Sequence, residues 1–326
     1  MRAFRIAVGI VSILLVASPA LAYTVYVTNQ GEDTISIIDG KAKKVLDTVK
    51  ISQGRPHNAI LSPDGKLLYT ANVGGGSVSI FDTATRKEVA VIPTGKGCHG
   101  VTLSPDGKSL WTANVQEDTV SVVDLGMRIV TKTIKVGSRP MLVVFSKDGK
   151  KAYVSNGGSG DVYVINVATG EVTKKLFAGK DAMGTTLTPD GKEVWVTEGG
   201  DNIVSIINTA EDKVDGEIKI GADTHGIVLT KDGKKAYVSV RKEDFVAVID
   251  TATRNVVAKI PVSKLPDILD LSPDEKELWV TSREAHAVDV IDTVKNQKVS
   301  TIKVGLPEVP GIVSPKPDPH GIVIAK

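Results

Sequence analysis

The stretch Ser62-Pro63-Asp64-Gly65-Lys66 decides the fold, because the chain repeats it. Related turns begin at residues 104, 146, 188, 230 and 272, each 42 residues after the one before. Proline sets φ at the first central position of such a turn, and glycine accepts the left-handed conformation that a hairpin with a G1 bulge needs. A fixed period of this length is the signature of a repeat architecture.

A second phrase opens with an aromatic residue and recurs after 43 residues once and then every 42 residues. It occupies residues 26–29, 69–72, 111–114, 153–156, 195–198, 237–240 and 279–282. In the unit from His57, residues 59–61, 67–71, 78–81 and 88–92 are predicted to form four short strands, since valine, isoleucine and threonine dominate there. Four strands every 42 residues is the blade length of a β-propeller.

The two ends of the chain are predicted to complete one blade together. Residues 24–28 form a second strand without a first strand before it, and residues 320–325 form an isolated first strand. Pairing of these two strands leaves no free sheet edge. We therefore expect an all-β, seven-bladed propeller with four antiparallel strands per blade, as a single domain over residues 23–326. A proline-rich insertion at residues 306–319 lengthens the last repeat, and we expect an ordered, semi-rigid loop there.

The phrase Tyr26-Val27-Thr28-Asn29 resembles the signature of the YVTN-repeat β-propeller family. All seven units follow its pattern, so the resemblance covers residues 23–326. It implies the propeller fold and a place among exported bacterial proteins, archaeal surface-layer proteins and propeller subunits of oxidoreductases. It assigns no activity, because function depends on the site and not on the fold.

Residues 1–22 have the three regions of a secretory signal peptide. Arg2 and Arg5 precede an apolar run at residues 6–16, and Ala20-Leu21-Ala22 is a small-x-small cleavage pattern. The run is too short to span a bilayer. We expect cleavage after Ala22 and a periplasmic or secreted protein; the alternative is a cytoplasmic first strand or helix.

Composition excludes several classes of protein and of site. Of 326 residues, 41% are hydrophobic and 24% are charged, which is ordinary globular composition and excludes disorder and a multi-span membrane protein. A single cysteine excludes an intrachain disulfide and a zinc site with several thiolates. The net charge of +2 comes from Arg2 and Arg5, so charge gives nucleic-acid binding no support.

One repeat position, just before each predicted first strand, carries four of the five histidines. Its seven residues are His57, His99, Met141, Met183, His225, Asp267 and His320. We expect these ring residues to surround the mouth of the central channel. Imidazole, thioether and carboxylate groups bind metals, and a mixture of histidine and methionine favours a soft or borderline ion such as copper. The four histidines are the candidate metal ligands, and Cys98 offers an adjacent thiolate.

Further irregular residues are expected on the same face. Arg55 and Arg139 precede two ring positions and are suited to holding a carboxylate or a phosphate. The loops between second and third strands contribute Glu198, Arg241, Arg283 and His286, where other units have asparagine or glycine. Together with the ring, these residues are the candidate ligand-binding set.

Several functions remain open at this stage. The first is an exported, non-catalytic binding or scaffold protein, expected to be a monomer, that presents this face to a small ligand, a metal ion or a partner protein. The second is a metal-dependent enzyme or an oxidoreductase-associated propeller subunit that uses the ring histidines, by analogy with propeller lyases and lactonases. Nucleic-acid binding is a weaker third. No catalytic residue is assigned, because no residue pair has the spacing of a known catalytic set.

A purely structural interpretation stands beside these functions. Repeat copying alone can produce a His-Gly pair before each strand. Met141 and Met183 are then packing residues, and Cys98 is a small buried side chain. For one metal ion, the ring residues must also lie close together across the channel.

Overall fold

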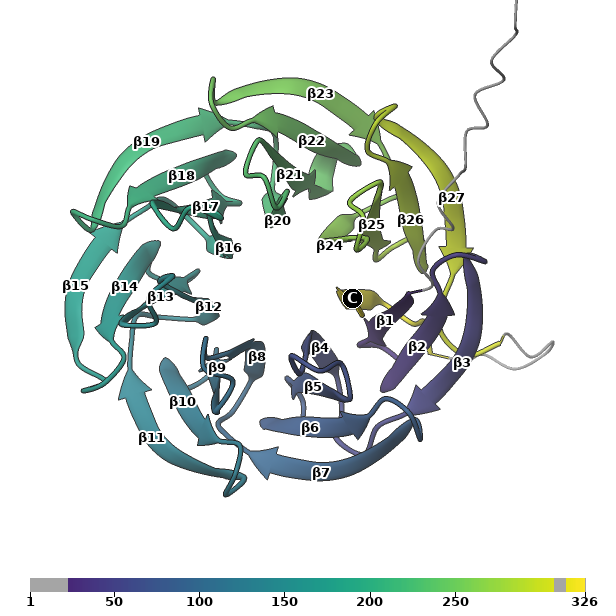
Figure 1. The fold of residues 1–326 in the computed structure, drawn as a ribbon, viewed down its shortest axis with the longest axis horizontal. Coiled ribbons are helices and arrows are strands. Elements are labelled where there is room, and N and C mark those ends of the chain that lie inside the picture. Colours follow the sequence, from purple (N-terminus) through teal and green to yellow (C-terminus); the bar gives the residue numbers. More distant parts are fainter. Residues whose placement is uncertain (1–22, 308–314, 326) are drawn as a thin grey trace, which may run out of the picture.

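The computed structural model describes residues 23–307 and 315–325, which form seven four-stranded antiparallel sheets. The sheets stand around a common axis as the blades of a propeller (Figure 1). The predicted all-β, seven-bladed architecture is confirmed. The predicted signal peptide at residues 1–22 lies outside the described residues.

Each blade places one strand beside the axis and one at the outer rim. The innermost strands are β4 (Pro56–Leu61), β8 (Cys98–Leu103), β12 (Pro140–Phe145), β16 (Ala182–Leu187), β20 (Thr224–Leu229), β24 (Pro266–Leu271) and β28 (Pro319–Ile324). The second strands, which carry the aromatic phrase, are β1 (Thr24–Asn29), β5 (Leu67–Asn72), β9 (Ser109–Asn114), β13 (Lys151–Asn156), β17 (Glu193–Glu198), β21 (Lys235–Val240) and β25 (Glu277–Ser282).

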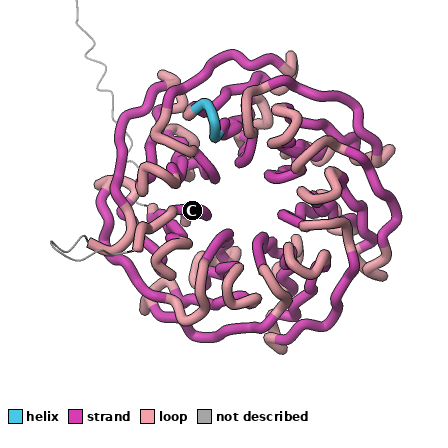
Figure 2. The backbone as a smooth tube through the Cα atoms, turned by 180° about the vertical axis from the view of Figure 1, so that it is seen from behind, coloured by secondary structure: helices cyan, strands magenta, loops and turns pink. Residues whose placement is uncertain are grey.

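The two remaining strands of each blade lie farther from the axis. The third strands are β2 (Thr34–Asp39), β6 (Ser77–Asp82), β10 (Thr119–Asp124), β14 (Asp161–Asn166), β18 (Ile203–Asn208), β22 (Phe245–Asp250) and β26 (Ala287–Asp292). The outer strands are β3 (Lys44–Lys50), β7 (Lys87–Pro93), β11 (Ile129–Lys135), β15 (Val172–Phe177), β19 (Lys213–Lys219), β23 (Asn255–Pro261) and β27 (Gln297–Lys303). A 3₁₀ turn, η1 (Arg241–Glu243), is the only helical segment in the described part of the chain (Figure 2).

The repeated turn phrase forms the hairpin between the first and second strands. Ser62 Oγ donates a hydrogen bond to Asp64 Oδ1 at 2.7 Å and accepts one from the Leu67 amide at 3.0 Å. Gly65 has a φ of 69°, in the left-handed region that glycine occupies without a steric penalty. The same side-chain pattern recurs at Ser104. Local chemistry therefore sets the period of the fold.

The apolar core lies between neighbouring blades. Trp195 of β17, which is fully buried, packs in one cluster with Val238 of β21 and Ile249 of β22 from the next blade. An aromatic residue at this repeat position fills the wedge between two sheets, which is why the position holds half of the chain's 14 aromatic residues.

The ring closes as predicted, because β28 pairs antiparallel with β1, with Ile324 opposite Val25. Tyr23 strengthens the closure from the first described residue. Its hydroxyl donates a hydrogen bond to Glu277 and accepts one from Trp279 Nε1 at 3.1 Å. No helix among the described residues is long and apolar enough to cross a membrane.

The predicted insertion at 306–319 is described only at its two ends. Residues 308–314 lie outside the described residues. At the later end, the carbonyls of Pro317 and Asp318 accept hydrogen bonds from the amides of Gly31 and Gln30, at 2.9 and 3.1 Å. This end is therefore fixed against the loop that follows β1.

Candidate functional site

The ring residues lie on the axis, but inside the innermost strands and not before them. Each is the second residue of its strand, as His57 is in β4 and His320 is in β28. The first strand predicted at 59–61 therefore begins earlier, at Pro56. The prediction failed because proline indicates a loop, yet proline is tolerated as the first residue of a strand.

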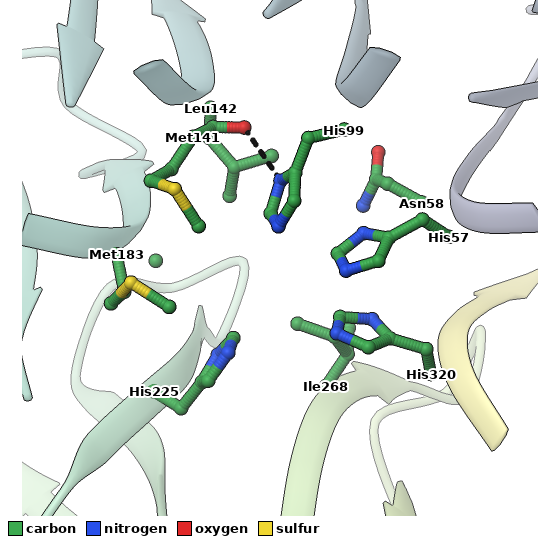
Figure 3. A pocket seen from close by; sticks show the side chains of 10 residues that line it. His57, Asn58, His99, Met141, Leu142, Met183, His225, Ile268 and His320 are labelled. Carbon is green, nitrogen blue, oxygen red and sulfur yellow. Dashed lines mark hydrogen bonds between the residues drawn. The ribbon is translucent and has the colours of Figure 1, made fainter. Parts of the chain in front are cut away.

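The ring side chains are mostly buried, and they converge from several blades (Figure 3). Apart from the partly buried His99, each is at most 6% exposed. The imidazole of His57 lies between two others, with ring centres 3.4 Å from His320 and 3.7 Å from His99. Six ring residues line one pocket together with Asn58, Leu142, Gly184 and Ile268 (Figure 3). The fold thus brings the ring residues into contact range of one another.

Five of the seven ring carbonyls accept a hydrogen bond from a hydroxyl of the blade before. The hydroxyl of Thr197 in β17 donates to the His225 carbonyl at 2.5 Å, and Ser239 in β21 donates to the Asp267 carbonyl at the same distance. A Cβ on Gly226 would lie 2.3 Å from the Asp267 carbonyl oxygen. Glycine after the ring residue is therefore explained by the close approach of the next blade. That requirement does not explain why the ring residue itself is histidine or aspartate.

Asp267 is completely buried and does not line the pocket itself, but it lies against two residues that do, His225 and His320. Its Oδ1 lies 3.2 Å from His225 Nε2, and its Oδ2 lies 3.0 Å from His320 Nε2. One donor atom from each of these three residues lies within 4.8 Å of the other two. This is the spacing at which one ion can contact all three.

Two arginines lie near Asp267, and each forms an ion pair with a different aspartate. Arg241 Nη1 and Arg283 Nε both lie 3.7 Å from Asp267. Arg241 pairs with Asp223 at 2.7 Å, and Arg283 forms a two-pronged pair with Asp318 at 2.7 and 2.9 Å. Three carboxylates against two guanidinium groups leave one negative charge. The group around Asp267 therefore favours a cation.

Burial determines the protonation of the pocket. It lowers the pKa of His57 and His225 well below the usual range, and it lowers the pKa of His99 to about 3. Burial alone would raise the pKa of Asp267, but the nearby imidazoles and the Arg283 guanidinium reverse this and hold it far below its usual range. At neutral pH the site therefore offers the Asp267 carboxylate and the neutral imidazoles of His57, His99 and His225, which are forms that bind metals.

Several buried atoms of the pocket lack a partner. Neither oxygen of Asp267 accepts a well-aligned hydrogen bond, and the Nδ1 atoms of His57, His225 and His320 have none either. A buried polar atom without a partner costs free energy, so native structures contain few of them. Their concentration at one point indicates a site that a ligand completes.

Other predicted residues do not join this pocket. Arg55 and Arg139 have exposed side chains. His286 lies in the loop between β25 and β26, with a φ of 52°, and does not line the pocket. Cys98 is fully buried in an apolar cluster with Ala71 and other residues, and burial raises the pKa of its thiol to about 11. The structure therefore gives no support to Cys98 as a thiolate ligand.

Glu198 is buried at the end of β17 and does not line the pocket. The equivalent Asn29 donates hydrogen bonds to Thr34 and Ser36 at 2.9 Å, whereas neither carboxyl oxygen of Glu198 has a partner. Burial, with the nearby charges of Asp201 and Asp181, raises the pKa of Glu198 to about 9. The side chain is therefore a neutral acid at neutral pH.

Sequence reasoning missed the outer carboxylates and the walls of the pocket. Asp223 and Asp318 both lie two residues before a ring residue, in the left-handed conformation, with φ of 66° and 47°. Their shared repeat position could have identified these two aspartates from the sequence. The sequence does not show the direction of their side chains. Asn58, Leu142 and Ile268 line the pocket at the position that other blades fill with glycine.

Comparison with known families and solved structures identifies proteins that are similar to this chain. A family model described as lactonase, 7-bladed β-propeller, matches residues 13–304. Hydrazine synthase from Kuenenia stuttgartiensis is similar at 25% identity with a TM-score of 0.77, over 83% of this chain and 92% of that one. No curated protein matches the chain by sequence.

Two further solved structures share the fold at lower identity. A candidate 6-phosphogluconolactonase from Bacteroides fragilis is 20% identical with a TM-score of 0.75, over 94% of this chain and 98% of that one. Dihydro-heme d1 dehydrogenase NirN, in complex with DHE, is 16% identical with a TM-score of 0.68, over 92% of this chain and 74% of that one. These likenesses show the architecture alone.

Proposed function

The chain belongs to the family of seven-bladed lactonase β-propellers, and on that fold we propose that it binds a divalent transition-metal ion on the propeller axis. The observation that carries the proposal is the convergence of His225, Asp267 and His320, with donor atoms within 4.8 Å of one another. Two imidazoles and one carboxylate suit zinc, iron(II) and copper(II). The pattern of residues 1–22 supports export of the protein.

Electrostatics favour a cation over an anion at this point. The nearby arginines already pair with Asp223 and Asp318, which leaves Arg241 Nε as a buried donor without a partner but balances the charge of both guanidinium groups. The remaining negative charge on Asp267 faces the Nε2 atoms of His225 and His320. A divalent ion would neutralise that charge and occupy the space between the three side chains.

Binding is favoured over catalysis because the three ligand side chains are inaccessible. His225, Asp267 and His320 are 4%, 0% and 2% exposed. An organic substrate cannot reach a metal ion held by these atoms without movement of the ring. We therefore propose a non-catalytic metal-binding protein that presents the face shaped by the buried ion to a partner.

Metal analysis after removal of bound ions with a chelator tests the proposal. Wild-type protein should retain one equivalent of zinc(II) or copper(II) through desalting, and the added ion should raise its melting temperature. The double variant Asp267→Asn/His320→Gln should lose both effects. His286→Gln is the matched control, because it removes the one histidine outside the ring. Equal metal content in all three proteins would overturn the proposal.

Lactone hydrolysis is the second candidate function, and the family match is the observation that favours it. A direct test is to measure the hydrolysis of simple γ- and δ-lactones by the proton that each hydrolysed molecule releases. A rate above buffer that is lost in Asp267→Asn/His320→Gln would place catalysis at the same ion. Absence of hydrolysis by the metal-loaded protein would leave binding as the function.

A further inference from the structure

The pocket has a second half in which the donor atoms are sulfur and nitrogen. Met141 and Met183 line it at 3% and 6% exposure, with His99 across from them. In Figure 3 both thioether ends extend toward the interior that the His99 ring also faces. No carboxylate lines the pocket, and the carboxylate of Asp267 lies against the other half, at His225 and His320. The chemistry of the methionine half therefore differs from that of the half beside Asp267.

The tautomer of His99 is set by its neighbour. Its Nδ1 lies 3.1 Å from the Met141 carbonyl oxygen, which can only accept a hydrogen bond, so Nδ1 carries the proton. The lone pair is then on Nε2, which points into the pocket in Figure 3. A carbonyl that holds the second nitrogen of an imidazole is the usual outer support of a metal-ligating histidine.

We propose that Met141, Met183 and His99 form a soft site that takes copper(I). Two thioethers and one neutral imidazole are uncharged, polarisable ligands, which select copper(I) over the harder divalent ions. This inference goes beyond the divalent site proposed above, because it assigns a different ion to a different set of donor atoms. The centres of the His99 and His320 rings are 6.2 Å apart, so the soft site and the Asp267 site are neighbours in one pocket.

Packing alone does not account for the two methionines. The other blades place histidine or aspartate at the same position, so the position does not require an aliphatic side chain. Leu142 and Ile268 already provide apolar walls at the next position along their strands. The thioethers instead occupy the places that imidazoles occupy elsewhere in the ring.

Competition for copper(I) with bicinchoninate, under anaerobic conditions, tests the inference on the full protein. Met141→Leu/Met183→Leu conserves side-chain volume, and it should weaken copper(I) binding at least about tenfold more than it weakens zinc(II) binding. Met127→Leu is the matched control, because Met127 is 61% exposed in a turn. It should retain wild-type copper(I) affinity.

The two proposals fail in different ways. Wild-type copper(I) affinity in Met141→Leu/Met183→Leu would overturn the soft site, while loss of zinc(II) in Asp267→Asn/His320→Gln would still support the first proposal. If Asp267→Asn/His320→Gln still binds copper(I), the soft site is supported. If the wild type also binds no zinc(II), the first proposal is overturned. Absence of both metals from wild type would overturn both.

Discussion

His320 Nε2 and Asp267 Oδ2 lie 3.0 Å apart at the centre of the propeller, where the two residues are 2% and 0% exposed. The contact joins the last strand of the chain, β28, to the blade beside it. It therefore links ring closure to the charge balance of the pocket. Breaking it should affect stability even when no metal is bound.

Asp267→Asn is expected to lower the free energy of unfolding by about 3 kcal/mol. The substitution keeps the shape of the side chain but removes the negative charge that faces two guanidinium groups. Urea denaturation followed by tryptophan fluorescence gives the measurement. Asp215→Asn, on the exposed surface of β19, should change stability by no more than about 0.5 kcal/mol. An Asp267→Asn protein as stable as that control would show that the charge has no structural role.

Because burial lowers the pKa of ring histidines, we expect the protein to lose stability in acid. The folded pKa of His99 is about 3, below its ordinary value of 6.5, so between these values the unfolded chain binds the additional proton. Stability is then present above pH 6.5 and is lost as the pH falls toward 3. Each imidazole that stays neutral contributes a slope of about 1.4 kcal/mol per pH unit in that window.

His99→Leu should reduce this acid slope by the contribution of one proton. Equilibrium unfolding measured from pH 7 to pH 4 gives the slope for each protein. His286→Gln, outside the ring, should keep the wild-type slope. Identical slopes for wild type and His99→Leu would mean that His99 is not held neutral.

For Glu198 we expect the stability to depend on pH in the opposite direction. Its folded pKa is about 9, above the ordinary value of 4.5, so the folded chain binds the additional proton between these values. Stability therefore falls as the pH rises through this range. Glu198→Gln removes the titration, and it should stabilise the protein by up to about 5 kcal/mol at pH 8 relative to wild type.

The measurement for Glu198 is the difference in unfolding free energy between pH 5 and pH 8. The difference should shrink in Glu198→Gln and stay unchanged in Glu217→Gln, which alters an exposed glutamate on β19. A Glu198→Gln protein that keeps the wild-type difference would contradict the raised pKa.

The sequence predicted the blades well, because each repeat contains its own turn chemistry. Ser62 and Gly65 determine a hairpin through contacts within five residues, so the period reveals the strand count without knowledge of the whole fold. Closure between β1 and β28 followed from the incomplete repeats at the two ends. These features depend on local order along the chain.

The site was predicted only as a set of positions. Repeat spacing placed Asp267 and His320 on one ring, but the ion-pair distances among them depend on how far each strand leans toward the axis. Arg55 and Arg241 looked equivalent as basic residues near the ring, yet one is exposed and the other pairs with Asp223 beside Asp267. Side-chain direction in three dimensions decided the difference, and the repeat pattern does not record it.

Gly226 provides a test of how the backbone positions the site. A Cβ at this residue would lie 2.3 Å from the Asp267 carbonyl oxygen, and that oxygen is already held by the Ser239 hydroxyl at 2.5 Å. β24 cannot move away without breaking this bond, so Gly226→Ala should displace Asp267. We expect a loss of about 2 kcal/mol in stability, together with weaker zinc(II) binding.

Gly126→Ala is the matched control for this clash. Gly126 lies in the turn between β10 and β11, where the nearest atom to an added Cβ is the flexible Asp124 carboxylate at 3.3 Å. Asn58 stands at the repeat position of Gly226 in another blade, so a side chain there is compatible with the fold in general. Comparing the unfolding and the zinc(II) titration of Gly226→Ala with those of Gly126→Ala separates the effect of the contact between Gly226 and Asp267 from a general effect of adding a methyl group. If Gly226→Ala matched Gly126→Ala in both measurements, the Asp267 backbone would have room to move, and the rigid positioning of the carboxylate would be wrong.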